Sequence, residues 1–329
     1  MKKNSLQNIV FLFLFSTHLH SQILGCTDSL SKNYNPKATQ NDGSCVYKTT
    51  NIRINNSVEL NSLIKETSGL TKWNHFLWTF NDDTDTCLYA LDTVTGMIQK
   101  THRLYNVQNT DWEEISQDST YLYVGDFGNN AKGNRTDLQI LKIDKSGLLE
   151  NKSNIVSLPF SYSNQTDFTP CAANKTNFDC EAFVVSNDSI YLFTKEWKSK
   201  KTSLYVLSKN PGTQVAQFKT TLNVDGLITG ATFLESKKLL VLCGYSSILQ
   251  PFIYLLYDYK NQEFFSGNKR KLNLKLPFYQ IEGITTSDGL NYYLSNEDFT
   301  RKPFVSNLQQ LHSIDLSSFL EPYLKSAKN

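Results

Sequence analysis

The sequence predicts an all-β fold of the β-propeller class. A short phrase recurs five times: a polar residue, a small or acidic residue, then an apolar residue, each followed by two apolar runs that are typical of strands. The first residues of successive copies lie 45, 68, 48 and 53 residues apart, close to the roughly 40–50 residues of known blade repeats. The copies are Ser68-Gly69-Leu70, Glu113-Glu114-Ile115, Glu181-Ala182-Phe183, Thr229-Gly230-Ala231 and Glu282-Gly283-Ile284.

Five four-stranded blades are predicted, with a sixth, degenerate blade as the alternative. The one long interval contains residues 160–179, a Thr-, Asn- and Ser-rich stretch that we interpret as a surface insertion. The fifth copy ends without an obvious outer strand, whereas residues 50–57 near the N-terminus alternate like one. We therefore expect this N-terminal strand to complete the blade that contains Glu282 and to close the ring, which removes an exposed sheet edge.

Composition fits one sizeable all-β domain and excludes two classes of partner. The chain of 329 residues is 40% hydrophobic and 12% aromatic, enough to bury a substantial core. Its formal net charge is +2, and Lys2 and Lys3 account for it, so the remainder is formally neutral. This balance gives no support for binding nucleic acid or an acidic membrane.

The N-terminus has the layout of a secretory signal peptide. Lys2 and Lys3 precede an apolar run, residues 9–15, that is too short to span a bilayer. We predict a signal peptide at 1–21, a small module at 22–48, the propeller at 49–320 and a C-terminal tail at 321–329. The protein is thus expected to be secreted or at the cell surface, without a transmembrane segment. The alternative is an outer-membrane lipoprotein, because residues 23–26 (ILGC) are similar to a lipobox that would anchor Cys26.

The cysteines predict two disulfides. Cys26 and Cys45 close a loop too small to have its own core, which favours a disulfide in an oxidising compartment. Cys171 and Cys180 flank the insertion and are expected to form the second bridge, whereas Cys87 and Cys243 lie in strands and are expected to be thiols. Residues 25–47 resemble a module of pattern GCTD…NYNP…DGSC found in secreted Bacteroidetes proteins. Its Asp28, Asn41 and Asp42 are alternative Ca²⁺ ligands, although Asn-Asp-Gly is more often a turn.

Strand alternation places an unusual number of carboxylates at the predicted axis. The innermost strand of each blade faces the channel, and side chains two residues apart share a face. The first position of each phrase and the residue two before it should therefore point to the axis. The residues so placed are Glu66, Ser68, Asp111, Glu113, Asp179, Glu181, Leu227, Thr229, Gln280 and Glu282. The next strands end at the same mouth with Asp126, Asn129, Lys195 and Glu297 among other polar residues.

Like charges so close together require compensation. Lys195 and Arg135 are candidate protein cations, and Ca²⁺ is the candidate cofactor because it takes oxygen ligands from carboxylates and amides. We predict a metal site formed by Glu113, Glu181 and Glu282 and assisted by Asp126 or Asn129. Two alternatives stay open: a wet, solvated channel, or a catalytic acid/base pair.

From residue 59 to 317 the chain resembles secreted Bacteroidetes β-propellers related to the SdiA-regulated and NHL-repeat propellers. The resemblance is carried by ETSGL (66–70), LWTFNDD (77–83), DWEEIS (111–116), DCEAF (179–183) and IEGIT (281–285). It implies a propeller with a ligand- or calcium-binding channel. Looser relatives include calcium-dependent lactonases, which use a histidine base, but His75, His102 and His312 are all expected away from the axis.

The function predicted is therefore a binding or scaffold protein outside the cytoplasm. We expect a monomer with an acidic, calcium-binding channel whose partner is an extracellular glycan, peptide or surface protein. The alternative is a metal-dependent hydrolase or lyase acting at the channel mouth. The chain contains no nucleophile elbow, HExxH helix or phosphate-binding glycine loop, which favours the non-enzymatic prediction.

Overall fold

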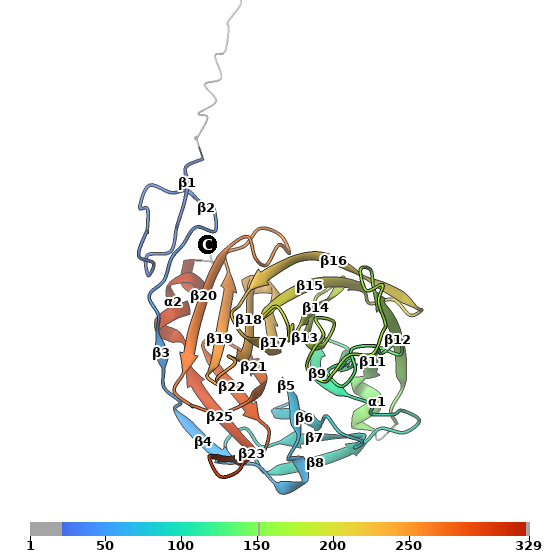
Figure 1. Ribbon diagram of the computed structural model, residues 1–329. Coiled ribbons are helices and arrows are strands. Elements are labelled where there is room, and N and C mark those ends of the chain that lie inside the picture. Colours follow the sequence, from blue (N-terminus) through green and yellow to red (C-terminus); the bar gives the residue numbers. More distant parts are fainter. Residues whose placement is uncertain (1–21, 151, 327–329) are drawn as a thin grey trace, which may run out of the picture.

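Strands arranged around a common centre make up most of the chain. The computed structural model describes residues 22–150 and 152–326, and nearly all regular structure there is β-strand (Figure 1). The predicted signal peptide, residues 1–21, lies outside the described residues. The sheets radiate from the centre of the ring, so the predicted all-β propeller class is confirmed.

Five groups of four strands form the ring, and we name them blades I to V. Blade I contains β5 (Thr67–Trp73), β6 (Phe76–Asn81), β7 (Cys87–Leu91) and β8 (Ile98–Arg103), and blade II contains β9 (Trp112–Gln117), β10 (Tyr121–Asp126), β11 (Gln139–Asp144) and β12 (Ile155–Tyr162). Blade III contains β13 (Cys180–Val185), β14 (Ser189–Thr194), β15 (Lys201–Ser208) and β16 (Gln214–Asn223), and blade IV contains β17 (Leu227–Leu234), β18 (Leu239–Tyr245), β19 (Pro251–Tyr257) and β20 (Asn268–Leu274). Blade V contains β21 (Ile281–Thr286), β22 (Asn291–Asn296), β25 (Gln310–Asp315) and, from near the N-terminus, β4 (Asn56–Glu59). Within each blade the neighbouring strands pair antiparallel.

The other described elements are short. They are the strands β1 (Leu24–Gly25), β2 (Gln40–Asn41), β3 (Asn51–Ile52), β23 (Phe299–Arg301) and β24 (Val305–Asn307), the 3₁₀ turns η1 (Ser62–Ile64) and η2 (Glu235–Lys237), and the helices α1 (Lys145–Leu149) and α2 (Ser317–Ser326). Strands of two or three residues do not build a further blade, so the pairing favours five blades over six.

The innermost strands close the ring. Strand β5 contacts β9, β9 contacts β13, β13 contacts β17, β17 contacts β21, and β21 returns to β5. Each pair of neighbouring blades also buries its own apolar cluster, because each blade has two apolar faces to cover. These clusters contain Trp78 between blades I and II, Phe183 between II and III, Phe264 between III and IV, Tyr292 between IV and V, and Leu311 between V and I.

The predicted N-terminal closing strand is confirmed, with one difference. Strand β4 pairs antiparallel with β25 and so supplies the fourth strand of the blade that contains Glu282. The segment predicted as one strand, residues 50–57, is divided between two blades. Its first part, β3, pairs in parallel with β20 of blade IV, and the chain then crosses to blade V.

Blades II and III are joined at their outer edges. Strand β12 pairs in parallel with β16 from Phe160 to Tyr162, which makes one eight-stranded sheet of the two blades. The predicted surface insertion, residues 160–179, therefore begins inside a strand, and both of these aromatic side chains are buried. The part of the insertion without regular structure starts after Tyr162.

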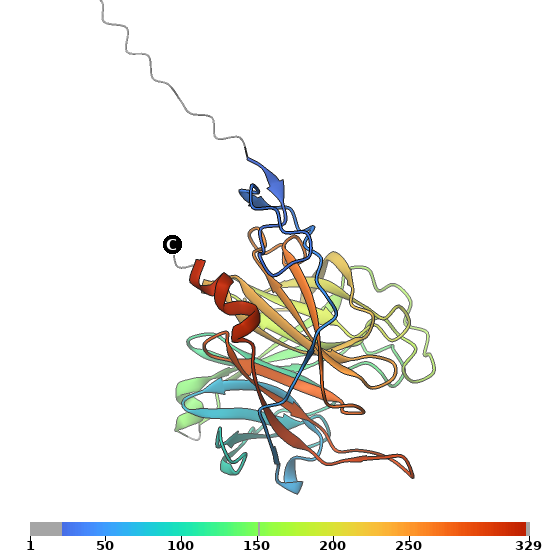
Figure 2. The ribbon, with the colours of Figure 1, turned by 90° about the vertical axis from the view of Figure 1, so that its left-hand side faces the viewer.

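The small module, residues 22–48, packs against blade IV, on the same side of the propeller as helix α2 (Figure 2). Its Asp28 carboxylate accepts hydrogen bonds from Tyr47 (2.7 Å) and from Tyr257 of β19 (2.5 Å). Asn41 donates to Asp258 at 2.9 Å and accepts from the backbone of Gly43. Since these oxygens hold turns and the docking contact, the geometry favours the structural interpretation of the module over a metal site.

Helix α2 covers the outer side of blades IV and V. Leu320 and Leu324 are buried in the cluster between these blades, so residues 321–326 of the predicted tail continue a packed helix. Between the helix and the module, the Arg270 guanidinium lies 4.7 Å from the Phe319 ring and 4.8 Å from the Tyr47 ring. Neither helix in the described part of the chain is long and apolar enough to cross a membrane.

One predicted disulfide is confirmed and the other is wrong. Cys26 and Cys45 are bridged, whereas Cys171 and Cys180 are free, as are Cys87 and Cys243. The second bridge fails because Cys180 is the first residue of β13 and its thiol is buried between blades II and III, beside the carbonyl oxygens of Ala182 and Phe193. The Cys171 sulfur lies instead against the turn at Gly133, on the surface side of the loop.

Candidate functional site

The recurring phrase marks a β-bulge in every innermost strand. The pairing of β9, β13, β17 and β21 with their neighbours skips one residue: Glu113, Glu181, Thr229 and Glu282, respectively. In β5 the register shifts between Ser68 and Thr71. A bulge inserts an extra residue and redirects its side chain. The phrase therefore recurs because each strand needs the same irregularity where it passes the axis.

The second position of the phrase explains how the axis is filled. It is small in four blades, with Gly69, Ala182, Gly230 and Gly283, and acidic only in blade II, with Glu114. A Cβ atom at Gly69 would lie 2.9 Å from the Glu114 Cα, and one at Gly230 would lie 3.3 Å from a Glu114 carboxylate oxygen. Gly69 and Gly230 thus leave the space that Glu114 occupies.

Glu114 connects three blades through its carboxylate. It accepts backbone N–H bonds from Leu70 of blade I (3.3 Å), Ile115 of blade II (2.9 Å) and Ala231 of blade IV (2.7 Å), and it is fully buried. Burial raises its pKa well above the usual range, and the three N–H donors oppose that shift. Strict alternation places Glu114 off the axis, so sequence analysis missed it. The single acidic residue at an otherwise small position was the available signal.

The innermost strands and the loops beside them also carry a cluster of eight carboxyl groups at one mouth of the ring, which we name the acidic chamber. They are Glu66, Asp82, Asp111, Glu113, Asp179, Glu181, Glu282 and Glu297. All eight were predicted to line the channel or its mouth, Asp82 as one of the polar residues at the strand ends. Lys195 is the buried cation among them.

Two trios within the chamber have carboxylate oxygens within 4.8 Å of one another. The inner trio is Glu113, Asp179 and Glu181, all buried, at the seam between blades II and III. The outer trio is Glu66, Asp82 and Glu297, all half-buried, at the seam between blades V and I. The structure thus brings together Glu113 and Glu181 as predicted, whereas Glu282 belongs to neither trio.

The inner trio already has partners. Lys195 Nζ lies 2.5 Å from Glu181 Oε2, and it also faces the rings of Trp197 and Tyr245 at 4.9 and 5.4 Å. Asp179 accepts hydrogen bonds from the backbone of Asn129 (2.6 Å) and from Trp197 Nε1 (2.7 Å). Burial alone would lower the pKa of Lys195, but Glu181 and the other carboxylates raise it well above its usual range, so the lysine stays charged.

The predicted assisting ligands Asp126 and Asn129 are engaged elsewhere. Arg135 forms an ion pair with Asp126 at 2.9 Å, and its backbone N–H donates to the Asn129 side-chain oxygen at 3.0 Å. Asn129 in turn donates to the carbonyl oxygen of Phe178. Neither residue belongs to either trio. Arg135, a predicted compensating cation, therefore binds within the loop after β10, and its charge also offsets part of the raised pKa of Asp111 in the chamber.

Glu282 has a free ligand atom. Its side chain is 5% exposed, and its Oε2 atom has no hydrogen-bond partner among the described residues. The neighbouring Gln280 donates to Glu297 Oε1 at 2.5 Å, and Gln280 and Thr229 also act on Glu282 as hydrogen-bonding side chains that lower its pKa against the effect of burial, without pairing Oε2. A buried carboxylate oxygen without a donor is costly, by about 1–3 kcal/mol or more for a charged group. This atom is therefore the clearest sign that the chamber accepts a ligand.

Crowding and burial shift the titration of the chamber. Burial and the charge of Glu66 raise the pKa of Asp82 to about 7, and burial and Asp179 raise that of Asp111 to about 6. Burial together with neighbouring carboxylates also raises the pKa of Glu113 and Glu297 well above the usual range. Protonation, or binding of a cation, would relieve this repulsion.

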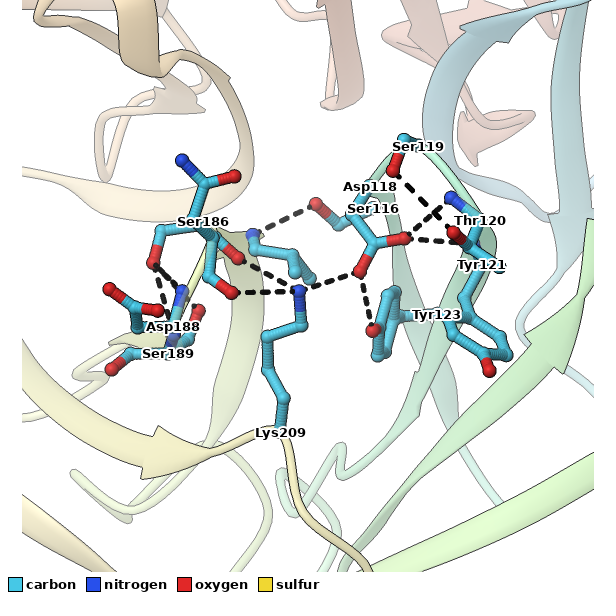
Figure 3. A network of polar contacts seen from close by, with 12 residues as sticks. Ser116, Asp118, Ser119, Thr120, Tyr121, Tyr123, Ser186, Asp188, Ser189 and Lys209 are labelled. Carbon is cyan, nitrogen blue, oxygen red and sulfur yellow. Dashed lines mark hydrogen bonds and ion pairs between the residues drawn. The ribbon is translucent and has the colours of Figure 1, made fainter.

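A paired carboxylate at the far side of the ring shows the contrast (Figure 3). Asp118 accepts hydrogen bonds from Tyr123 (2.8 Å) and Lys209 (2.6 Å), and Lys209 also donates to the carbonyl oxygen of Ser186 in blade III. Burial works against ionisation here, but Lys209 and the backbone donors hold the pKa of Asp118 at about 2. This network ties two blades together, and among the described residues no such set of donors serves the outer trio of the chamber.

Asp82 should make the metal-free protein lose stability as the pH rises from about 4 to 7. Folded Asp82 keeps its proton up to about pH 7, whereas an unfolded Asp loses it near pH 3.9, so between these two values the folded state binds more protons and the free energy of unfolding falls as the pH rises. Thermal melts in EDTA at pH 5, 6 and 7 measure this slope, and Asp82→Asn should lack the Asp82 contribution to it. Burial lowers the pKa of His312 to about 4, which makes stability rise with pH over part of the same range. This effect is the same in the wild type and in Asp82→Asn, so it cancels in their comparison. An identical slope in the variant would contradict the prediction.

The three histidines among the described residues lie away from the chamber. His312 of β25 is buried, with Nδ1 2.7 Å from Ser57 and Nε2 2.8 Å from Asn296. His102 lies in the outer strand β8 and His75 in the turn between β5 and β6. A catalytic base at this mouth would therefore have to be a carboxylate in the described part of the chain.

Comparison with known proteins adds little to the geometry. No family model and no curated protein sequence matches the chain. One similar solved structure is U3-55K, at 9% identity and a TM-score of 0.35, where the match covers 75% of this chain and 68% of that one. Another is a chain of the mitotic checkpoint complex, at 10% identity and a TM-score of 0.42, with 82% of this chain and 97% of that one covered. A third is the WD40 repeats of RRP9, at 10% identity and a TM-score of 0.35, with 75% of this chain and 66% of that one covered. At these identities and TM-scores, the strand pairing remains the basis for the propeller assignment.

Proposed function

We propose that this protein is a binding propeller that acts outside the cytoplasm and holds a hard divalent cation, Ca²⁺ in the first instance, in its acidic chamber. One observation carries the proposal: the buried Glu282 Oε2 atom has no hydrogen-bond partner within residues 22–150 and 152–326, and it lies among carboxyl groups that outnumber their cations there. The Cys26–Cys45 bridge supports an oxidising compartment.

The chemistry of the chamber suits such a cation. Its candidate ligands are carboxylate oxygens from several blades, which are the donors that Ca²⁺ prefers. Because the ligands come from separate strands of a closed ring, their positions are fixed by the fold rather than by one flexible loop. A bound cation at the mouth then offers its remaining coordination positions to the glycan, peptide or surface protein expected as the partner.

Calcium should raise the thermal stability of the protein. A ligand that binds only the folded state adds about 2.7 kcal/mol at 100 times its Kd. Melting curves in EDTA and with added Ca²⁺, Mg²⁺ or Mn²⁺ measure this, and Glu282→Gln should reduce the increase because it removes a ligand charge. Glu263→Gln, an exposed glutamate outside the chamber, is the matched control and should behave like the wild type.

The same measurement can refute the proposal. If none of the three cations changes the wild-type melting curve at millimolar concentration, the chamber is a solvated channel. If Glu282→Gln and Glu263→Gln respond to Ca²⁺ equally, the cation binds elsewhere on the protein.

A further inference from the structure

The two trios differ in what already neutralises them. In the inner trio, Glu181 has an ion pair with Lys195 and Asp179 has two hydrogen-bond donors. Lys195 is itself 4% exposed, so its ammonium group is a permanent part of the buried site. A lysine held 2.5 Å from a carboxylate occupies the position where a cation would sit.

The outer trio lacks such an occupant. Among the described residues, no side chain forms an ion pair with Glu66, Asp82 or Glu297. The one hydrogen bond to a carboxylate of this trio comes from Gln280 to Glu297. All three groups are half-buried, so solvent and a hydrated ion can reach them. Several carboxylate oxygens therefore remain available for coordination.

Glu282 belongs to the same seam. It lies in β21 of blade V, next to β5, and two residues after the Gln280 that binds Glu297. Among charged groups, Glu282 is the strongest contributor to the raised pKa of Glu297 and also contributes to that of Asp82. Burial raises the pKa of Glu282, and Lys195, the strongest charge acting on it, lowers it, so Glu282 is within reach of both trios. Its buried Oε2, which has no hydrogen-bond partner among the described residues, is an independent sign of a ligand beside these carboxylates.

We infer that the divalent cation binds at the outer trio, with Glu282 as the fourth protein ligand, and that Lys195 takes the place of a second cation in the inner trio. This inference rests on the proposed function and specifies its site. It shifts the centre of binding from the predicted Glu113 and Glu181 to Glu66, Asp82 and Glu297. It also predicts one cation per chain, where the number of carboxylates alone would allow two.

Calcium titration by isothermal calorimetry tests the site, with Ca²⁺ itself as the probe. The wild type should bind one Ca²⁺ per chain. Asp82→Asn in the outer trio should weaken binding at least tenfold, whereas Glu113→Gln in the inner trio should change the Kd by less than about threefold. Glu263→Gln, outside the chamber, should bind as the wild type does. Lys195→Met should raise the stoichiometry from one to two, because the inner trio loses its own cation.

The outcomes separate this inference from the function on which it rests. If Glu113→Gln abolishes binding and Asp82→Asn does not, the cation lies in the inner trio and the inference fails while the proposed function stands. If the wild type binds no Ca²⁺, the proposed function fails as well. Should Lys195→Met not fold, the double variant Lys195→Met/Glu181→Gln removes both charges of the pair. It should still bind one Ca²⁺, and loss of binding there would also overturn the inference.

Discussion

Replacing Glu114 with alanine should lower the free energy of unfolding by about 2–4 kcal/mol. The substitution leaves the backbone N–H groups of Leu70 and Ala231 without an acceptor at the buried centre of the ring, and each such donor costs about 1–3 kcal/mol. Removing a fully buried carboxylate offsets part of this loss. Urea denaturation at pH 7, followed by tryptophan fluorescence, measures the change.

The neighbouring residue supplies the control. Glu113→Ala removes the same side chain one position earlier, but the Glu113 carboxylate faces the crowded inner trio, so its loss should be neutral or stabilising. Glu114→Gln keeps the volume and one acceptor oxygen and should fall between the wild type and Glu114→Ala. If the two alanine variants lose the same stability, Glu114 is one more crowded carboxylate and does not connect the blades.

The fold was predictable because every blade of a propeller has the same structural requirements. Each blade needs a strand that passes the axis, a sharp irregularity there and apolar faces on both sides, and these needs leave the same phrase in the sequence five times. The closing strand was predictable for a related reason. The last blade lacked an outer strand in the sequence, and an alternating segment near the N-terminus had no blade of its own. That segment therefore had to supply the missing strand.

The same phrase limited the prediction of the site. Alternation with period two correctly placed Glu113 and Glu181 at the axis, but it cannot represent a bulge, which changes the direction of the following side chain. Glu114 was therefore missed, although it connects three blades. Asp82 was predicted at the mouth but not as a metal ligand, because it lies just beyond the end of β6, where periodicity gives no side-chain direction.

Competition between partners was the other limit. The sequence predicts that Asp126, Asn129 and Arg135 lie at the mouth of the channel. In the folded protein, however, Arg135 binds both Asp126 and Asn129, so their polar groups are paired with one another. The Cys171–Cys180 bridge failed for a similar reason, since a cysteine at a strand start can face either the loop or the core. Spacing along the chain does not determine such choices, because they depend on contacts between blades.

Deletion of residues 22–60 should abolish cooperative folding or cause aggregation. It removes β4 and so leaves the outer edge of β25 unpaired, which is a template for association with other chains. It also removes Ile52 and Leu60, which are 6% and 2% exposed and contribute roughly 1.5–3 kcal/mol each. Together with the lost strand pairing, the free energy of unfolding should fall by about 5 kcal/mol or more, which is comparable with the whole stability of a typical domain. Size-exclusion chromatography and thermal melts of the purified variant measure the effect.

A shorter deletion isolates the strand from the module. Removal of residues 22–48 takes away the disulfide-closed module but retains β3, β4 and the contacts of Leu60, so this variant should stay monomeric and unfold cooperatively. Leu60→Ala in the full chain should lose about 2–5 kcal/mol with the ring intact, because it creates a cavity without opening the sheet edge. If the two deletions melt alike, the blade that contains Glu282 is stable with three strands. The N-terminal segment would then be an attachment to the propeller and not its closure.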